Sequence, residues 1–405
     1  MRQVWKLSAT QALCMSGSFL FVLLGGIIGS ELAPTPGLAT LPISVLIVGL
    51  AASVLPAGAL IRRIGRRAAF TASAVLAGLG CMTAGFAIAA ANFWLFCTAA
   101  LLLGANNAMV MQYRFAAIEY VPPERASKAI AIVMSGALGA AWLGPEIAVR
   151  AADLVEGAHY AGSFLAGIGL YAIATLLLVQ TPDSTRTLQA DSRPPRRLAE
   201  IARQADFRIA VLAAIASYAV MSFIMTATPI SMHVVDLHTE VATKRVIQGH
   251  LLAMYLPSLA SGWIVSRLGT RPVIVGGTLL MSACIAIAAF ADHSVLHYAW
   301  ALVLLGVGWN LMFIAGTTLL TRTYRPHERI RVQTLNDFLV FGSQAAASLL
   351  AGLALATIGW ERLNLVTLPL LAAVLLSVAS GAVAATFPEA VNELRQRIDP
   401  FVRAE

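Results

Sequence analysis

The sequence has few charged residues. Only 12% of its 405 residues are Asp, Glu, Lys or Arg, whereas soluble domains carry about 25%. Hydrophobic residues make up 59% of the chain, and the mean hydropathy is +0.78. Most of a chain of this composition has no favourable contact with water. We therefore expect a protein embedded in a membrane rather than a soluble one.

The sequence also lacks the motifs that carry catalysis or hold cofactors. It has no glycine-rich phosphate loop ending in Lys-Ser or Lys-Thr, so we expect no direct use of ATP. No Ser/His/Asp set or pair of carboxylates marks a catalytic centre, so we expect neither an enzyme nor a cofactor. The cysteines Cys14, Cys81, Cys97 and Cys284 lie singly in apolar runs. Their spacing suits no metal site, and none is expected.

Long apolar runs fill the chain instead. A helix of about 20 apolar residues spans a bilayer, and we identify twelve such segments. The first follows Arg2 and Lys6 as a secretory signal would, but its length and the later spans indicate a retained helix. The fold class is therefore an all-α membrane protein with twelve transmembrane helices. The expected spans are 11–30, 38–60, 69–90, 94–117, 128–149, 158–180, 208–230, 246–266, 272–291, 298–320, 332–355 and 364–386.

The longest polar stretch, 181–206, divides the spans into two groups of six. The groups are related, because the segment Gly58–Arg67 recurs as Gly262–Arg271, at an offset of 204 residues. Parallel six-helix repeats are one plan of secondary transporters, with the substrate site at the midplane between the repeats. We expect two pseudo-symmetric six-helix bundles at 1–180 and 207–388, a cytoplasmic linker at 181–206 and a cytoplasmic tail at 389–405.

The net charge of +8 is unevenly placed along the chain. Nearly all of the 28 Lys and Arg residues fall in loops on one side of the membrane if both termini lie on that side. This distribution follows the positive-inside rule, which explains the charge better than nucleic-acid binding does. We expect a monomeric multi-pass protein of a bacterial inner membrane, with both termini in the cytoplasm and no nucleic-acid partner.

The short loop after the second span carries a motif. Its sequence, GALIRRIGRR, resembles the pattern Gly-x-Leu-Ala-Asp-Arg-x-Gly-Arg-Arg/Lys of the major facilitator superfamily. Together with the twelve spans and the basic central loop, the resemblance covers the whole chain. It implies two bundles that rock around a central site. The residues of the expected gating motif are Gly58, Arg62, Arg63, Gly65, Arg66, Arg67 and Glu119.

The motif departs from the family pattern at one position, because Arg62 stands where the family has an acid. We expect Glu119, at the inner end of the fourth span, to pair with Arg66 or Arg67. A solvated charge at a helix end is the alternative for Glu119. Because Arg62 replaces the acid, an ion pair with exchanged charges is possible, in which Arg62 binds Asp337 of the eleventh span.

Charged residues at membrane depth are functional candidates. Asp337 lies well within a span and shares a polar stripe with Gln333, Asn336 and Gln344. We expect it to load and release a coupling proton, and an ion pair with an arginine is the alternative.

Glu146 is a second candidate for proton coupling, in the fifth span. An i,i+4 pair with Arg150 is its alternative role. It follows Gly144-Pro145, which resembles a degraded form of the glycine-rich motif of antiporters in the superfamily. A kinked helix packed through small residues explains the same pattern without antiport.

The fourth span supplies a candidate substrate-binding face, where Asn107, Met111 and Arg114 lie on one side of the helix. In the superfamily this helix lines the central cavity, so the planar guanidinium of Arg114 can bind a polar or anionic solute. An internal ion pair or a position near the membrane surface is the alternative. Aromatic residues at similar depth suit a flat organic solute, and core packing is the alternative for each. The expected substrate-binding residues are Arg114, Asn107, Tyr113, Trp142, Tyr218, Tyr255, Trp309 and Asn310.

These features and the resemblance predict a secondary active transporter of a small organic solute, coupled to protons and working by alternating access. The first and seventh spans carry no acid within the membrane, which argues against export of cationic drugs. We favour uptake of a neutral or anionic nutrient, such as a vitamin of the riboflavin type or an iron chelate. Efflux of a drug or metabolite is the alternative, and a non-transporting membrane sensor is a more distant one.

Overall fold

The computed structural model describes residues 1–122, 125–182 and 196–380, and the regular elements in these ranges are helices. Helices suit a bilayer because each backbone polar group finds its partner within the same segment. The elements are α1 (Arg2–Leu32), η1 (Pro36–Leu38), α2 (Leu41–Ile64), α3 (Arg66–Ala89), α4 (Phe93–Val110), α5 (Tyr113–Glu119), α6 (Ala126–Arg150), α7 (Ala161–Val179), α8 (Leu198–Ala202), α9 (Ala205–Ile230), η3 (Ser231–Val235), α10 (Glu240–Tyr255), α11 (Ser258–Leu268), α12 (Thr270–Phe290), α13 (Val295–Thr321), η4 (Pro326–Glu328), α14 (Arg329–Leu365) and a last helical stretch at 368–380.

Ten helical segments of the described ranges are long and apolar enough to cross a membrane. An eleventh is bent, because Glu240–Ala260 and Gly262–Leu268 meet at 57°. The last of the ten, Arg331–Ser380, has 50 residues, whereas about 20 residues span a bilayer. Gly359 breaks it with a φ of 75°. This segment therefore combines the spans expected at 332–355 and 364–386, and residues 381–386 lie outside the described ranges.

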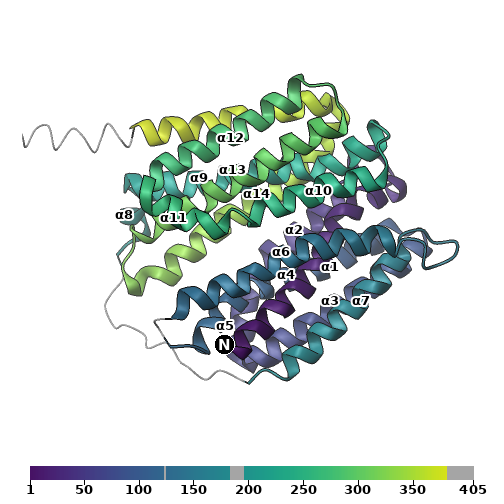
Figure 1. The fold of residues 1–405 in the computed structure, drawn as a ribbon, viewed down its shortest axis with the longest axis horizontal. Helices are drawn as coiled ribbons and strands as arrows, with labels where there is room; N and C mark the ends of the chain where they lie inside the picture. The colour runs from purple at the N-terminus through teal and green to yellow at the C-terminus, as the bar shows by residue number, and fades with distance from the viewer. Residues whose placement is uncertain (123–124, 183–195, 381–405) are drawn as a thin grey trace, which may run out of the picture.

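Figure 1 shows the helices in two bundles that lie side by side. The first bundle contains α1 to α7, and the second contains α8 to α14. We call the end of the molecule near the N-terminus, α5 and α8 the linker side, and the opposite end the far side. Half of the expected linker, residues 183–195, and all of the expected tail at 389–405 lie outside the described residues.

The two bundles share a sharp turn at equivalent positions. Gly65 follows α2 with φ 83° and ψ 162°, and Gly269 follows α11 with φ 86° and ψ 164°. Glycine is the residue that adopts a positive φ without strain. The two glycines are 204 positions apart. The repeat found in the sequence is therefore also a repeat of the backbone.

Glycines let helices of the first bundle touch at the backbone. A Cβ atom at Gly104 of α4 would collide with the Leu46 carbonyl of α2. A Cβ atom at Gly144 of α6 would also collide, with the Ser16 carbonyl of α1. Small residues at such contacts drive helix association in membranes. The Gly144-Pro145 pattern thus has a packing role.

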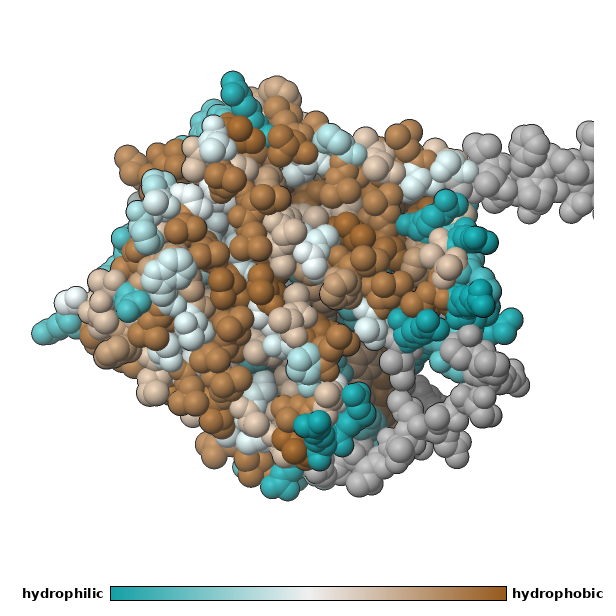
Figure 2. Space-filling view, turned by 180° about the vertical axis from the view of Figure 1, so that it is seen from behind, coloured by the Kyte–Doolittle hydropathy of each residue, from teal (hydrophilic) through white to brown (hydrophobic). Residues whose placement is uncertain are grey.

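The surface in Figure 2 is apolar over its middle, and hydrophilic residues gather towards the two ends, most densely near the linker side. Large apolar side chains such as Phe86, Trp94 and Phe290 are more than 60% exposed. Apolar patches of this extent are unusual on soluble monomers. Contact with lipid explains them, and the polar ends fit the two membrane surfaces.

Candidate functional site

A cavity of about 250 Å³ lies between the two bundles. Helices α1, α2, α4, α5 and α6 of the first bundle and α9, α10, α11, α13 and α14 of the second contribute to its wall. The wall is mainly apolar and contains half of the 12 methionines of the chain. Methionine side chains are flexible and polarisable, so the wall can adapt to a ligand. These methionines are Met15, Met111, Met134, Met221, Met225 and Met254.

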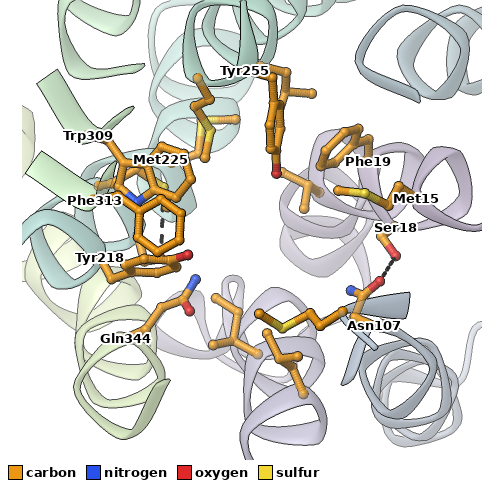
Figure 3. A pocket seen from close by; sticks show the side chains of 18 of the residues that line it. Met15, Ser18, Phe19, Asn107, Tyr218, Met225, Tyr255, Trp309, Phe313 and Gln344 are labelled. Atoms are coloured by element: carbon orange, nitrogen blue, oxygen red, sulfur yellow. Dashed lines mark hydrogen bonds between the residues drawn. The ribbon is translucent and has the colours of Figure 1, made fainter. Parts of the chain in front are cut away.

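Aromatic rings of the second bundle form one side of the cavity (Figure 3). Trp309 and Phe313, one turn apart on α13, stack with ring centroids 5.2 Å apart and planes at 12°. Tyr218 of α9 meets Trp309 edge-on at 5.2 Å, and Tyr255 of α10 lies 6.2 Å from the same ring. We call Tyr218, Tyr255, Trp309 and Phe313 the aromatic wall. It offers a flat ligand several ring faces and edges.

Two asparagines of the cavity are held by neighbouring side chains. The Ser18 hydroxyl donates a hydrogen bond of 2.6 Å to Asn107 Oδ1 (Figure 3). Asn310 Nδ2 donates to the Met254 carbonyl at 2.7 Å and to Ser258 Oγ at 2.6 Å. Since a carbonyl only accepts, the Asn310 amide has one possible orientation. These contacts fix both side chains before a ligand arrives.

Two basic residues of the cavity keep a nitrogen atom unpaired. Arg114 is the second residue of the short helix α5, and no described residue hydrogen-bonds its buried Nε atom. Its guanidinium lies 4.8 Å from the ring of Phe115. His250 is fully buried, and its Nδ1 donates to the Leu302 carbonyl at 2.8 Å. The opposite nitrogen, Nε2, has no partner among the described residues.

The two carboxylates expected to carry protons do not line the cavity. Asp337 is half-buried on α14 and accepts a hydrogen bond of 3.2 Å from Asn336 Nδ2. Glu146 pairs with Arg150 at 2.9 Å, the expected i,i+4 contact, and also with Lys244 Nζ at 3.0 Å. Lys244 belongs to the second bundle. The Glu146 carboxylate therefore joins the two bundles, which the sequence had not suggested.

A family model described as the Major Facilitator Superfamily matches residues 7–259 and 210–400. Among curated proteins, the riboflavin transporter RfnT of Brucella anthropi is 38% identical over 380 residues, which cover 92% of this chain and 94% of the relative. The chain belongs to the major facilitator superfamily. It is a multi-pass membrane transporter of a small molecule and not an enzyme, as expected from the sequence.

Other members of the superfamily share its length and fold. The uncharacterised transporter YdeG of Bacillus subtilis is 30% identical, over 90% of this chain and 88% of its own. Among solved structures, the nucleoside transporter NupG superposes with a TM-score of 0.71 at 13% identity, covering 93% of this chain and 98% of its own. The human organic anion transporter MFSD10 gives 0.69 at 14% identity, covering 93% and 99%. The fold is therefore shared with both structures.

The superfamily motif lies on the linker side, around the turn at Gly65. Gly58, Arg62 and Arg63 are in the last turns of α2, and Arg66 and Arg67 open α3.

The expected pair of this motif is present. Arg66 Nη2 lies 2.6 Å from Glu119 Oε1 at the end of α5, with both side chains less than 20% exposed. Arg62 is exposed, and no ion pair within the described ranges joins it to Asp337. The motif thus ties α3 to α5 inside the first bundle, and the pair with exchanged charges is not formed in this structure.

Two of the expected substrate-binding residues lie away from the cavity. Tyr113 is fully buried in the first bundle, 3.8 Å from Cys14 Sγ and against Phe70. Trp142 has a 54% exposed side chain, and its carbonyl accepts a hydrogen bond from Gln248. Tyr113 precedes Arg114 directly, so the two side chains leave the helix about 100° apart. The other six expected residues line the cavity: Arg114, Asn107, Tyr218, Tyr255, Trp309 and Asn310.

The cavity also contains residues that the sequence did not indicate. One stripe of α1 faces it, with Gln11, Met15, Ser18, Phe19 and Val22. Helix α1 is apolar and buried on nearly all sides, so hydrophobic periodicity could not reveal which side faces a ligand. Gln344 of α14 did give a signal, since it belongs to the polar stripe of the eleventh span.

Proposed function

We propose that this transporter takes up a flat, neutral or anionic organic solute of the riboflavin type. The observation that carries the proposal is the aromatic wall, which presents stacked and edge-on rings to the cavity between the bundles. Stacking of a flat heterocycle on an aromatic side chain stabilises binding by about 1–3 kcal/mol. The 38% identity to a riboflavin transporter along almost the whole chain supports this class of solute.

The charges of the cavity favour the same class. Arg114 contributes a guanidinium, and the described lining contains no Asp or Glu. A cationic drug would therefore meet a positive charge without a compensating carboxylate. A neutral or anionic solute instead finds hydrogen-bond donors at Arg114 and at Asn107. This composition argues against a cationic drug as the solute, and efflux of another drug or metabolite stays the alternative to nutrient uptake.

Contacts on the far side support alternating access. There, Lys244 binds Glu146, and Glu240 of α10 accepts a hydrogen bond of 2.6 Å from the Tyr160 hydroxyl. Burial lowers the pKa of His159, but its hydrogen bonds with Asp153 and Glu240 outweigh burial and raise it. These contacts join residues of both bundles, so the far side opens only when they break. By the positive-inside rule we assign the linker side, and both termini, to the cytoplasm.

Asp337 is our candidate for the coupling proton. It is half-buried, and Asn336 is its hydrogen-bond partner in the described structure. Its charge also interacts with that of Arg114 in the first bundle. Glu146 already has two cationic partners, which hold it ionised. We therefore assign proton transfer to Asp337 and closure of the far side to Glu146.

The aromatic wall can be tested by growth of a bacterium that cannot make riboflavin. We expect the chain to restore growth at low external riboflavin, and Trp309→Ala to lower riboflavin uptake about 5- to 100-fold, since one stacking partner is lost. Trp300→Ala is the matched control, because Trp300 lies on the same helix but is 57% exposed, against 4% for Trp309. Equal uptake by the two variants, or no rescue by the parent chain, contradicts the proposal.

A further inference from the structure

Gln344 is a polar side chain of the cavity that has no hydrogen-bond partner among the described residues. It lies on α14, lines the cavity and is 8% exposed. No described residue hydrogen-bonds its carboxamide, and its Oε1 atom is fully shielded. An unpaired buried amide costs free energy. A side chain left in this state between two well-packed bundles points to a ligand as its partner.

The position of Gln344 tells which part of a ligand it can meet. Figure 3 shows its carboxamide directed into the cavity next to the Tyr218 hydroxyl, at the edge of the aromatic wall. A ring system stacked on Trp309 or Tyr218 would therefore present its edge, rather than its face, to Gln344. The asparagines of the cavity each have a side-chain or backbone partner, since Asn107 binds Ser18 and Asn310 Nδ2 binds the Met254 carbonyl. Arg114 Nε, His250 Nε2 and Trp309 Nε1 also lack partners among the described residues, but they offer single nitrogen atoms rather than a donor and an acceptor side by side.

The chemistry of the carboxamide defines the complementary edge. A primary amide offers one acceptor and two donor hydrogens side by side. Its partner is a planar edge with an adjacent N–H and C=O, as in a cyclic imide or lactam. Two such hydrogen bonds form together, in the way that Asn or Gln reads the edge of a base.

We propose that Gln344 is a specificity-determining residue that pairs with the imide edge of a heterocycle stacked on the aromatic wall. The inference rests on the proposed function, and it narrows the substrate class from flat organic solutes to those with an N–H/C=O edge. A flavin has such an edge on its pyrimidine ring, at N3–H and the neighbouring carbonyls. A solute whose only polar group is a carboxylate lacks a donor beside its acceptor and cannot form this pair.

The test uses binding of flavins to the purified full chain, followed by quenching of flavin fluorescence. The probes are riboflavin, lumiflavin (the same ring without the sugar chain) and their N3-methyl derivatives. Methylation removes the imide donor, so we expect it to weaken binding to the parent chain about tenfold. In Gln344→Met, which keeps the side-chain volume, methylation should change binding less than about twofold.

Gln11, a second amide side chain of the cavity, provides the control for this comparison of methylated and unmethylated flavins. Gln11 lies on α1 in the other bundle, and in Gln11→Met the tenfold effect of N3 methylation should persist. A methylation effect that is equally large in Gln344→Met overturns the inference while leaving riboflavin transport intact. If lumiflavin binds and riboflavin does not, the proposed function fails, but the Gln344 inference is still tested by lumiflavin and its N3-methyl derivative. If neither binds the parent chain, both are overturned.

Discussion

At the residue scale, the ion pair between Arg66 and Glu119 shows how the superfamily motif acts in this chain. Both side chains are less than 20% exposed, and their atoms approach to 2.6 Å. The glycine turn at Gly65 places Arg66 at the start of α3, directly beside the end of α5. The family's acid is absent at Arg62, and the pair between Arg66 and Glu119 together with Gly65 contributes to the geometry of the turn.

The ion pair between Arg66 and Glu119 predicts an effect on the thermal stability of the protein. Glu119→Gln keeps the shape of the side chain but removes its charge, and a hydrogen bond to a charged group is worth about 1.5–3 kcal/mol. We expect a lower melting temperature of the purified protein. Glu156→Gln is the same chemical change at an exposed far-side position, and it should leave the melting temperature unchanged. Equal effects of the two changes would show that the pair does not stabilise the bundle.

The positions of the expected site residues match the structure where charge and periodicity agree, and their roles stay predictions. Arg114 and Asn107 share a helical face and both line the cavity. Tyr113 was chosen for its depth alone, and its side chain points into the first bundle. The contact between Glu146 and Lys244 joins residues 98 positions apart. No local pattern in the chain can encode such a pairing.

At the element scale, helix breaks decide which side chains reach the cavity. The fourth expected span divides into α4 and α5 around Met111 and Gln112, and Arg114 follows that break. Pro257 precedes α11, in the part of the chain where the eighth span bends. The sequence predicted the spans from hydropathy, but hydropathy did not predict these breaks. Pro257 was a local signal for the second one, since proline interrupts a helix.

The close packing of α2 and α4 predicts a difference between two glycines. Gly104→Ala would place a Cβ atom against the Leu46 carbonyl, whereas a Cβ at Gly276 of α12 meets nothing within 4 Å. Overpacking of this kind costs about 1–3 kcal/mol. We expect Gly104→Ala to lower the melting temperature of the purified protein and Gly276→Ala to leave it unchanged or raise it, since alanine favours a helix. The reverse order would contradict the packing described here.

At the scale of the whole molecule, the two bundles repeat the same backbone turn, whereas the cavity between them is lined by residues that differ between the two halves. The turns at Gly65 and Gly269 match in φ and ψ to within a few degrees. The cavity is asymmetric by contrast, since the aromatic wall belongs to the second bundle and Arg114 to the first. A ligand between them contacts both bundles at once. Its binding can therefore bias their relative position, which alternating access requires.

The proposed proton coupling concerns the whole molecule, because the proposal links a charge on α14 to movement of both bundles. If Asp337 carries the proton, Asp337→Asn should still exchange riboflavin across a membrane at equilibrium. It should lose accumulation driven by a pH gradient, because the amide binds no proton in the physiological range. Glu146→Gln, which leaves Asp337 in place, should retain some dependence on the gradient.

The most direct measurement is the uptake of labelled riboflavin by proteoliposomes that contain the parent chain, with and without an imposed pH gradient. We predict accumulation above the external concentration when the outside is acidic, and only equilibration when the gradient is collapsed or when Asp337 is replaced by Asn. A riboflavin flux that is the same with and without the pH gradient would contradict proton coupling. Absence of any riboflavin flux above that of protein-free liposomes would contradict the central claim that this transporter carries a solute of the riboflavin type.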